Sequence, residues 1–351
     1  MIDGLVAARS VIITCGSGGV GKTTTAAVLA QAAAEKGRRA CVVTIDPARR
    51  LADALGLERI GNEPTLVGGS WPGELWAVML DAKGTFDALV ESQAPSVAQA
   101  DRIKANRFYR NISGALSGTQ EYMAAEKLYE LHGSKRFDIV VVDTPPSRAA
   151  LDFLDAPARL TRFLDHRLYR LLTAPHRGPL RALNAAAQTV MRTIAKVVGA
   201  EVLDDAITFF KAFEGMDAGF RARADAVARL HADPDTAFLL VAPPRRDTVD
   251  EACYVAEQLE RSGRPVAALI VNRMTPQFLP VDVAGLAATG DPLTQNLLEL
   301  TTLAAAEEEQ LAPLLRAVGS APVLRVPLLG TDVHDLESLA AVGSYVVNVA
   351  R

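Results

Sequence analysis

Residues 11–24 read VIITCGSGGVGKTT, and this stretch decides the fold. Gly16, Gly21, Lys22 and Thr23 match the pattern G-x-x-x-x-G-K-[ST]. An apolar, β-branched run precedes the match and an alanine-rich segment follows it, which is the order of strand, phosphate-binding loop and helix. The alternative, a glycine turn that holds no nucleotide, does not account for these flanking segments.

The chemistry expected of this loop is the binding of a nucleoside triphosphate. Glycines let backbone N–H groups surround the phosphates, and the N-terminus of the following helix adds a partial positive charge. We expect Lys22 to reach the β- and γ-phosphates of ATP and the Thr23 hydroxyl to bind Mg²⁺. The predicted nucleotide-binding loop comprises Gly16, Ser17, Gly18, Gly19, Val20, Gly21, Lys22, Thr23 and Thr24.

Apolar runs recur along the chain and alternate with segments that favour helices. This alternation predicts an α/β fold with a mostly parallel, twisted sheet of about seven strands, flanked by helices on both faces. The predicted strands are Val11–Cys15, Ala40–Ile45, Leu75–Leu80, Ile139–Val142, Phe238–Val241, Val266–Val271 and Val323–Val326.

Two segments, 84–134 and 150–231, lack strand runs and predict an inserted α-helical subdomain. The sheet domain is then assigned to residues 1–83, 135–149 and 232–351.

In the second helical segment, four phenylalanines fall close to a helical spacing. They either pack as ordinary core, which is the commoner case, or line an apolar groove. These are Phe209, Phe210, Phe213 and Phe220.

Two aspartates follow apolar runs and complete the expected site. Asp143 ends a predicted strand, as the metal-site acid of a phosphate-binding loop protein does, and Asp46 follows the strand after the loop helix. In an open parallel sheet both positions reach the carboxyl edge, where ligands bind. The alternative is that each aspartate only caps the end of its strand.

Composition excludes several classes of protein. The 351 residues include 37 Lys and Arg against 41 Asp and Glu, for a formal net charge of -4, so nucleic acid is not an expected partner. No secretory signal and no apolar stretch long enough to span a bilayer is visible, which predicts a cytoplasmic protein without an integral membrane segment. Cys15, Cys41 and Cys253 form no Cys-x-x-Cys pair and are expected to be small buried residues.

Longer motifs resemble those of one family, the arsenite-pump and tail-anchored-protein-targeting ATPases. These belong to the SIMIBI class of P-loop NTPases, and the chain resembles their actinobacterial members. Gly18-Gly19-Val20 in the loop is typical of that class. DPARRLADALG at 46–56 resembles the switch I of the family, and DTPPSRAALDFLDAP at 143–157 resembles switch II. IVNRM at 270–274 and VPLLGTDVHDLESL at 326–339 are similar to its adenine-side segments.

The resemblance implies a role for each matching residue. Asp46 would position the hydrolytic water, Asp143 would lie behind Mg²⁺ in its second shell, and Asn272 would hydrogen-bond adenine, while Pro327 and Leu328 would line the base. Catalysis would then depend on Asp46 and Lys22. No Asn/Thr-Lys-x-Asp segment for guanine occurs, so ATP is favoured over GTP.

Ser17 departs from the pattern of the family, which has a lysine at this position. That lysine reaches across a dimer interface to the phosphates of the partner, as an arginine finger does. Serine carries no charge, so we expect either a slow homodimeric ATPase or one half of a heterodimer with a lysine-bearing paralogue. Arg49, Arg50 or Arg148 are the alternative sources of charge.

The resemblance leaves the wider function open between two readings. In the first, a dimeric ATPase uses ATP-driven closure to regulate a partner. In the second, an ATP-switched chaperone binds apolar or transmembrane helices. A membrane-positioning ATPase ranks last because the C-terminus offers no basic amphipathic helix, and the cysteine spacing argues against a zinc bridge, a metalloid site or an iron–sulfur role.

Overall fold

A computed structural model describes residues 2–46, 48–107, 109, 119–166, 199–277 and 291–347. The chain divides into two compact units. The sheet unit comprises Met1–Leu80, Leu128–Asp152 and His231–Arg351, and the helical unit comprises Asp81–Lys127 and Phe153–Leu230.

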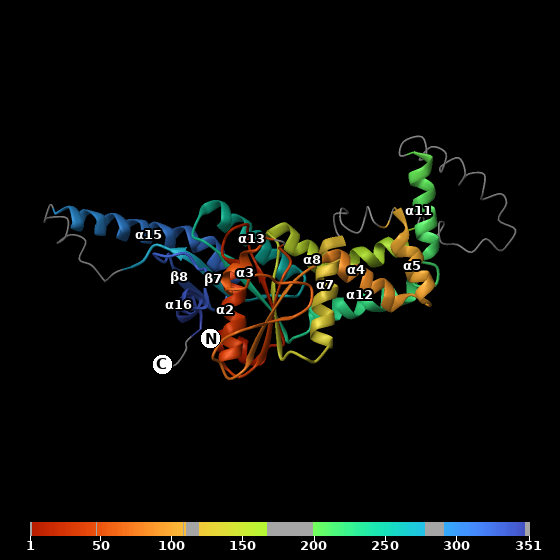
Figure 1. The fold of residues 1–351 in the computed structure, drawn as a ribbon. Helices are drawn as coiled ribbons and strands as arrows, with labels where there is room; N and C mark the ends of the chain where they lie inside the picture. The colour runs from red at the N-terminus through yellow and green to blue at the C-terminus, as the bar shows by residue number, and fades with distance from the viewer. Residues whose placement is uncertain are drawn as a thin grey trace. The chain divides into compact units, whose positions relative to one another are not determined.

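A twisted sheet lies at the centre of the sheet unit (Figure 1). Among the described residues it has eight strands, in the order β3-β4-β2-β5-β1-β6-β7-β8. All neighbouring strands are parallel except β3, which runs antiparallel to β4 at the edge. The strands are β1 Val11–Cys15, β2 Arg39–Thr44, β3 Thr65–Val67, β4 Glu74–Met79, β5 Ile139–Asp143, β6 Thr236–Ala242, β7 Val266–Met274 and β8 Val323–Pro327. The predicted mostly parallel α/β fold is confirmed, and each of the seven predicted runs is a strand.

The central strands are buried on both faces. Every residue of β1, β5 and β6 is buried, which explains why these strands appear in the sequence as continuous apolar runs without alternation. The eighth strand, β3, has only three residues with one of them buried, so it carries no such run and was not predicted.

Helices border the sheet and fill the helical unit. In the sheet unit lie α1 Ile2–Ala8, α2 Lys22–Glu35, α3 Arg50–Ala54, α13 Arg246–Arg261, α15 Pro292–Val318 and α16 Leu336–Val346. The helical unit contains α4 Ala82–Gln93, α5 Val97–Ala105 and α11 Ala200–Ala212. Three further helices have residues in both units, namely α7 Thr119–Gly133, α8 Ser147–Asp165 and α12 Asp217–Ala232.

The right-handed crossover connections between parallel strands determine where a ligand site is expected on this sheet. The chain moves from β1 through α2 to β2 on one side, and from β6 through α13 to β7 on the other. Because parallel crossovers are right-handed, these two helices lie on opposite faces of the sheet. The order therefore reverses between the neighbours β1 and β6, and ligands of open α/β sheets bind beyond the carboxyl ends of the strands at such a point.

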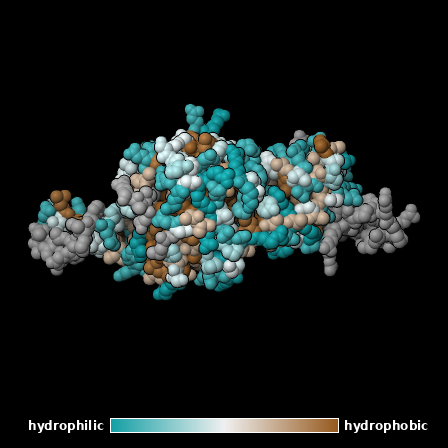
Figure 2. All heavy atoms as spheres, turned by 90° about the horizontal axis from the view of Figure 1, so that it is seen from below, coloured by the Kyte–Doolittle hydropathy of each residue, from teal (hydrophilic) through white to brown (hydrophobic). Residues whose placement is uncertain are grey.

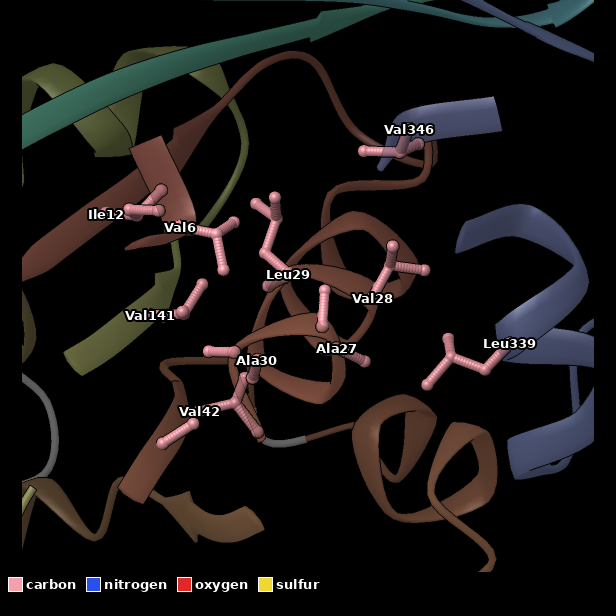
Figure 3. Packing of buried hydrophobic residues seen from close by; sticks show 14 of the residues in the cluster. Val6, Ile12, Ala27, Val28, Leu29, Ala30, Val42, Val141, Leu339 and Val346 are labelled. Atoms are coloured by element: carbon pink, nitrogen blue, oxygen red, sulfur yellow. The ribbon is translucent and has the colours of Figure 1, made fainter. Parts of the chain in front are cut away.

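The buried face of α2 connects the sheet to both ends of the described chain. Alanines along α2 let neighbouring elements approach closely, and Leu29 at its centre is fully buried. The same hydrophobic cluster includes residues of α1 and α16 (Figure 3). Its labelled members are Val6, Ile12, Ala27, Val28, Leu29, Ala30, Val42, Val141, Leu339 and Val346.

Aromatic rings pack together inside the helical unit. Phe209, Phe213 and Phe220 are buried, and the Phe209 and Phe213 ring centroids are 4.7 Å apart. Phe210 is half-buried and lies 5.9 Å from Phe163, whose side chain is exposed. Three of the four phenylalanines singled out in the sequence therefore belong to the core of this unit.

Candidate nucleotide-binding site

The loop between β1 and α2 requires glycine at defined positions. Gly16 has φ 155°, and a Cβ there would lie 2.2 Å from the carbonyl oxygen of Val241 in β6. Gly21 has φ 100°, and a Cβ there would lie 2.2 Å from Asn272 Nδ2. Both contacts are far shorter than a Cβ tolerates, so the neighbouring strands β6 and β7 shape the loop.

A pocket of about 330 Å³ opens at this loop. It brings predicted loop residues together with both predicted aspartates, Asp46 and Asp143, at the carboxyl edge of the sheet. Its lining comprises Gly18, Gly19, Gly21, Lys22, Thr23, Thr24, Asp46, Arg50, Asp53, Ala54, Asp143, Thr144, Pro145, Pro146, Arg273 and Val333.

Asp143 lies at the end of β5 with one carboxylate oxygen held and the other unpartnered. Oδ2 accepts hydrogen bonds from Thr23 Oγ1 at 2.7 Å and from Thr44 Oγ1 at 2.8 Å. Oδ1 is buried and has no hydrogen-bond partner among the described residues. Burial raises the pKa of Asp143, and the two threonine hydrogen bonds oppose that rise. An oriented carboxylate with one unpartnered oxygen beside the Thr23 hydroxyl fits a site for Mg²⁺ and its water ligands.

Lys22 begins α2 and is the buried cation of the site. Its Nζ donates a hydrogen bond to the Ser17 carbonyl oxygen at 2.7 Å. Burial lowers its pKa, while the charge of Asp143 opposes the shift. A buried ammonium group at the helix N-terminus is suited to a ligand of high negative charge, because such a ligand compensates the cost of burying the cation.

Asp46 lies two residues beyond the end of β2 and takes part in a local network. Its Oδ1 accepts a hydrogen bond from the Ala48 backbone N–H at 2.9 Å. Its Oδ2 lies 3.5 Å from NH1 of Arg50, the first residue of α3. The backbone N–H of Asp46 donates to Thr44 Oγ1 at 3.2 Å, so Thr44 connects the two acids.

Asn272, near the end of β7, fastens the loop from the other side. Its Nδ2 donates to the Val20 carbonyl oxygen at 2.8 Å, and its Oδ1 accepts from the Arg273 N–H at 3.0 Å. Arg273 adopts φ 60°, an uncommon value for a residue other than glycine, and it lines the pocket.

The remaining predicted residues, and Asn272 with them, are not among the residues that line this pocket. Pro327 ends β8, and Leu328 is exposed, with its N–H donating to the Met274 carbonyl oxygen at 2.7 Å. Gly16, Ser17 and Val20 belong to the loop but do not line the pocket.

The polar residues of the site that sequence reasoning missed include Thr44, Asp53, Thr144 and Arg273. Thr44 ends a predicted strand two residues before Asp46, and this position was the available signal. Arg273 follows Asn272 directly, within the adenine-side motif already quoted.

The fold and the loop define a P-loop nucleotide-binding protein. The sequence model of the family described as "Anion-transporting ATPase" matches residues 9–283. The chain therefore belongs to the anion-transporting ATPase family, and it is a P-loop ATPase of that family. This result confirms the resemblance seen in the loop and the two switch-like motifs.

Known proteins similar to this chain come from several different organisms. An uncharacterized protein of Streptomyces coelicolor is 31% identical over 341 residues, covering 97% of this chain and 77% of the relative. A Cryptosporidium parvum protein named "ATPase ASNA1 homolog" is 25% identical over 293 residues, covering 83% and 72%. The "ATPase ARSA1" of Chlamydomonas reinhardtii is 24% identical over 357 residues, covering 96% of this chain and 42% of the relative.

The length and hydropathy of the described helices show whether any of them could cross a membrane. None of them is both long enough and apolar enough to cross a bilayer. On the face drawn in Figure 2, hydrophilic residues surround smaller apolar patches.

Proposed function

We propose that this chain binds Mg·ATP in the loop pocket and hydrolyses it to ADP and phosphate. The observation that carries the proposal is the convergence of Lys22, Thr23, Asp46 and Asp143 on one pocket at the carboxyl edge of the sheet. These residues come from three segments of the chain: the start of α2, the residues after β2 and the end of β5. Family membership supports the proposal because the relatives with functional names are called ATPases.

The proposed roles follow from the geometry. Lys22 exchanges its contact with the Ser17 carbonyl for the β- and γ-phosphates, and the Thr23 hydroxyl, which now donates to Asp143, would help to hold Mg²⁺. Mg²⁺ supplies positive charge that neutralises the transferring phosphoryl group. Asp143, whose Oδ1 has no described partner, would hold the ion through one of its waters.

Asp46 orients the attacking water in this proposal. The water oxygen bonds to the γ-phosphorus, the bond to the bridging oxygen breaks with its electron pair leaving on ADP, and the proton of the water passes to the product phosphate. On the adenine side we assign Asn272, Pro327 and Leu328 to the base. Asn272 is already fixed against Val20 of the loop.

We also propose that the ATPase works as a dimer and that the helical segments 84–134 and 150–231 transmit closure to a partner or client. Ser17 leaves two routes to full activity. A lysine-bearing paralogue supplies the charge across a heterodimer, or a cation of this chain supplies it within one protomer. A client groove built from the phenylalanine stripe is not supported, because Phe209, Phe213 and Phe220 are buried within the helical unit.

Calorimetry and turnover of the purified chain test this proposal. We expect Mg·ATP to bind with measurable heat, Lys22→Ala to abolish that heat, and phosphate release to follow binding in the wild type. Asn272→Ala should weaken binding of ATP and ADP alike. Absence of binding by the folded wild-type protein would contradict the proposed function.

A further inference from the structure

Positive charge in the pocket comes from three side chains of the described residues: Lys22, Arg50 and Arg273. Lys22 donates to the Ser17 carbonyl oxygen of the loop, and Arg273 lies near the end of β7. Arg50 differs from both because it already contacts a catalytic group. Its guanidinium NH1 lies 3.5 Å from Asp46 Oδ2.

The ion pair between Asp46 and Arg50 is weak enough for Arg50 to leave it for another anion. The Arg50 side chain is 64% exposed and the Asp46 side chain 32% exposed, so water screens their attraction. A triphosphate carries more negative charge than one carboxylate and would enter the pocket that both residues line. Lys22 and Arg50 line the same pocket, and the charge of Arg50 adds a small contribution to the lowering of the Lys22 pKa, which burial mainly causes.

Both carboxylate oxygens of Asp46 have a partner in the structure. Oδ1 accepts the Ala48 N–H and Oδ2 faces Arg50, so the carboxylate is engaged on both oxygens. A carboxylate has about four acceptor positions, and withdrawal of one of these groups leaves more of them open to a water molecule. The arginine is the mobile one, because the backbone N–H is fixed by the chain.

We propose that Arg50 leaves Asp46 when ATP binds and contacts the γ-phosphate, supplying within one protomer the positive charge that Ser17 does not supply to a partner. The movement frees Oδ2 of Asp46 for the attacking water in the same step. Arg50 is then a catalytic residue of this chain. The inference rests on the proposed function, since it assumes that Mg·ATP occupies the pocket.

The neighbouring Arg49 provides a matched control. Its NH2 donates to the Glu58 carbonyl oxygen at 3.0 Å, and it lines a separate pocket of about 230 Å³ together with Arg59 and Met79. The two arginines are adjacent in sequence and identical in chemistry, but only Arg50 lines the phosphate pocket. The third alternative, Arg148, has a side chain outside the described part of the chain.

The test compares Arg50→Ala with Arg49→Ala in the full chain. We expect Arg50→Ala to lower kcat by ~10²-fold or more, since groups that neutralise a transferring phosphoryl contribute this much, and to leave Kd for Mg·ADP unchanged. Its affinity for Mg·ADP with aluminium fluoride, which mimics the transferring phosphoryl group, should fall in parallel. Arg49→Ala should match the wild type in all three measurements.

A rescue experiment separates a catalytic from a structural role. Ser17→Lys places the lysine typical of the family at the dimer position, and we expect it to restore turnover and aluminium fluoride binding in the Arg50→Ala background. Arg50→Ala that behaves like Arg49→Ala overturns the inference while leaving the proposed function intact. A wild-type chain that binds Mg·ATP without turning it over also overturns it, whereas failure to bind Mg·ATP contradicts the proposed function itself.

Discussion

Asp143 lies at the last position of β5 with only 1% of its surface exposed, and its chemistry follows from that burial. Two hydroxyl groups fix one oxygen of its carboxylate, while desolvation raises the pKa of the group. A buried carboxylate of this kind is suited to bind near a cation, because a nearby metal ion stabilises the charged form that burial disfavours.

This raised pKa predicts a pH dependence of nucleotide binding. As pH falls, Asp143 takes up a proton above the range of an ordinary aspartate, and the neutral group loses its hold on the water of the metal. We therefore expect the affinity for Mg·ATP to fall with decreasing pH, measured by fluorescence titration of a labelled ATP. The phosphates of ATP titrate in the same way whether the protein is wild type or Asp143→Asn. The variant lacks the titrating carboxyl group, so its plot of log Kd against pH should have a shallower slope than that of the wild type. Equal slopes would refute the role of Asp143.

At the scale of elements, α12 shows how one helix carries two different ion pairs. Arg223 donates from Nε to Glu126 Oε1 at 2.5 Å, and the Glu126 side chain is only 4% exposed. Arg221 contacts Asp165 at 3.0 Å, where both side chains are partly exposed. Residues two apart in a helix do not share a face, so the two arginines face different surroundings.

This contrast predicts two different effects on stability. Arg223→Ala removes the cation that contacts the buried Glu126 carboxylate, so we expect the free energy of unfolding to fall by about 3 kcal/mol. Arg221→Ala removes an exposed pair and should cost less than about 1 kcal/mol. Denaturant unfolding followed by circular dichroism measures both, and equal losses would contradict the interpretation.

At the scale of the whole molecule, the sheet unit joins segments from both ends of the chain in one core. Ile2 and Val6 near the N-terminus, and Leu339 and Val346 near the C-terminus, belong to the same buried cluster as Leu29 of α2. The helix that begins with Lys22 is therefore supported from its outer side by distant parts of the sequence.

Removing one of these distant contacts should destabilise the sheet unit. Leu339 is fully buried, so we expect Leu339→Ala to lower the free energy of unfolding by about 3 kcal/mol through lost burial and a residual cavity. Leu303 of α15 is 50% exposed, and Leu303→Ala should cost within about 1 kcal/mol. Chemical denaturation of both variants provides the measurement, and a larger loss for Leu303→Ala would show the core to be assigned incorrectly.

Much of the site was predictable because its signals are local. The loop needs glycine where φ is positive, as at Gly21, and a helix that starts with Lys22, and such backbone requirements leave a direct trace in the sequence. Asp143 and Asp46 were predictable because buried parallel strands appear as continuous apolar runs that end at the ligand edge.

The sequence by itself determined the phosphate loop, seven of the eight strands and the family, since each depends on patterns within a few consecutive residues. Only the tertiary structure decided that Asn272 fastens Val20, that Thr44 joins Thr23 on Asp143, and that Arg50 rather than Arg49 lines the pocket. These outcomes depend on which side chains meet across strands distant in sequence, and local propensity does not encode that pairing.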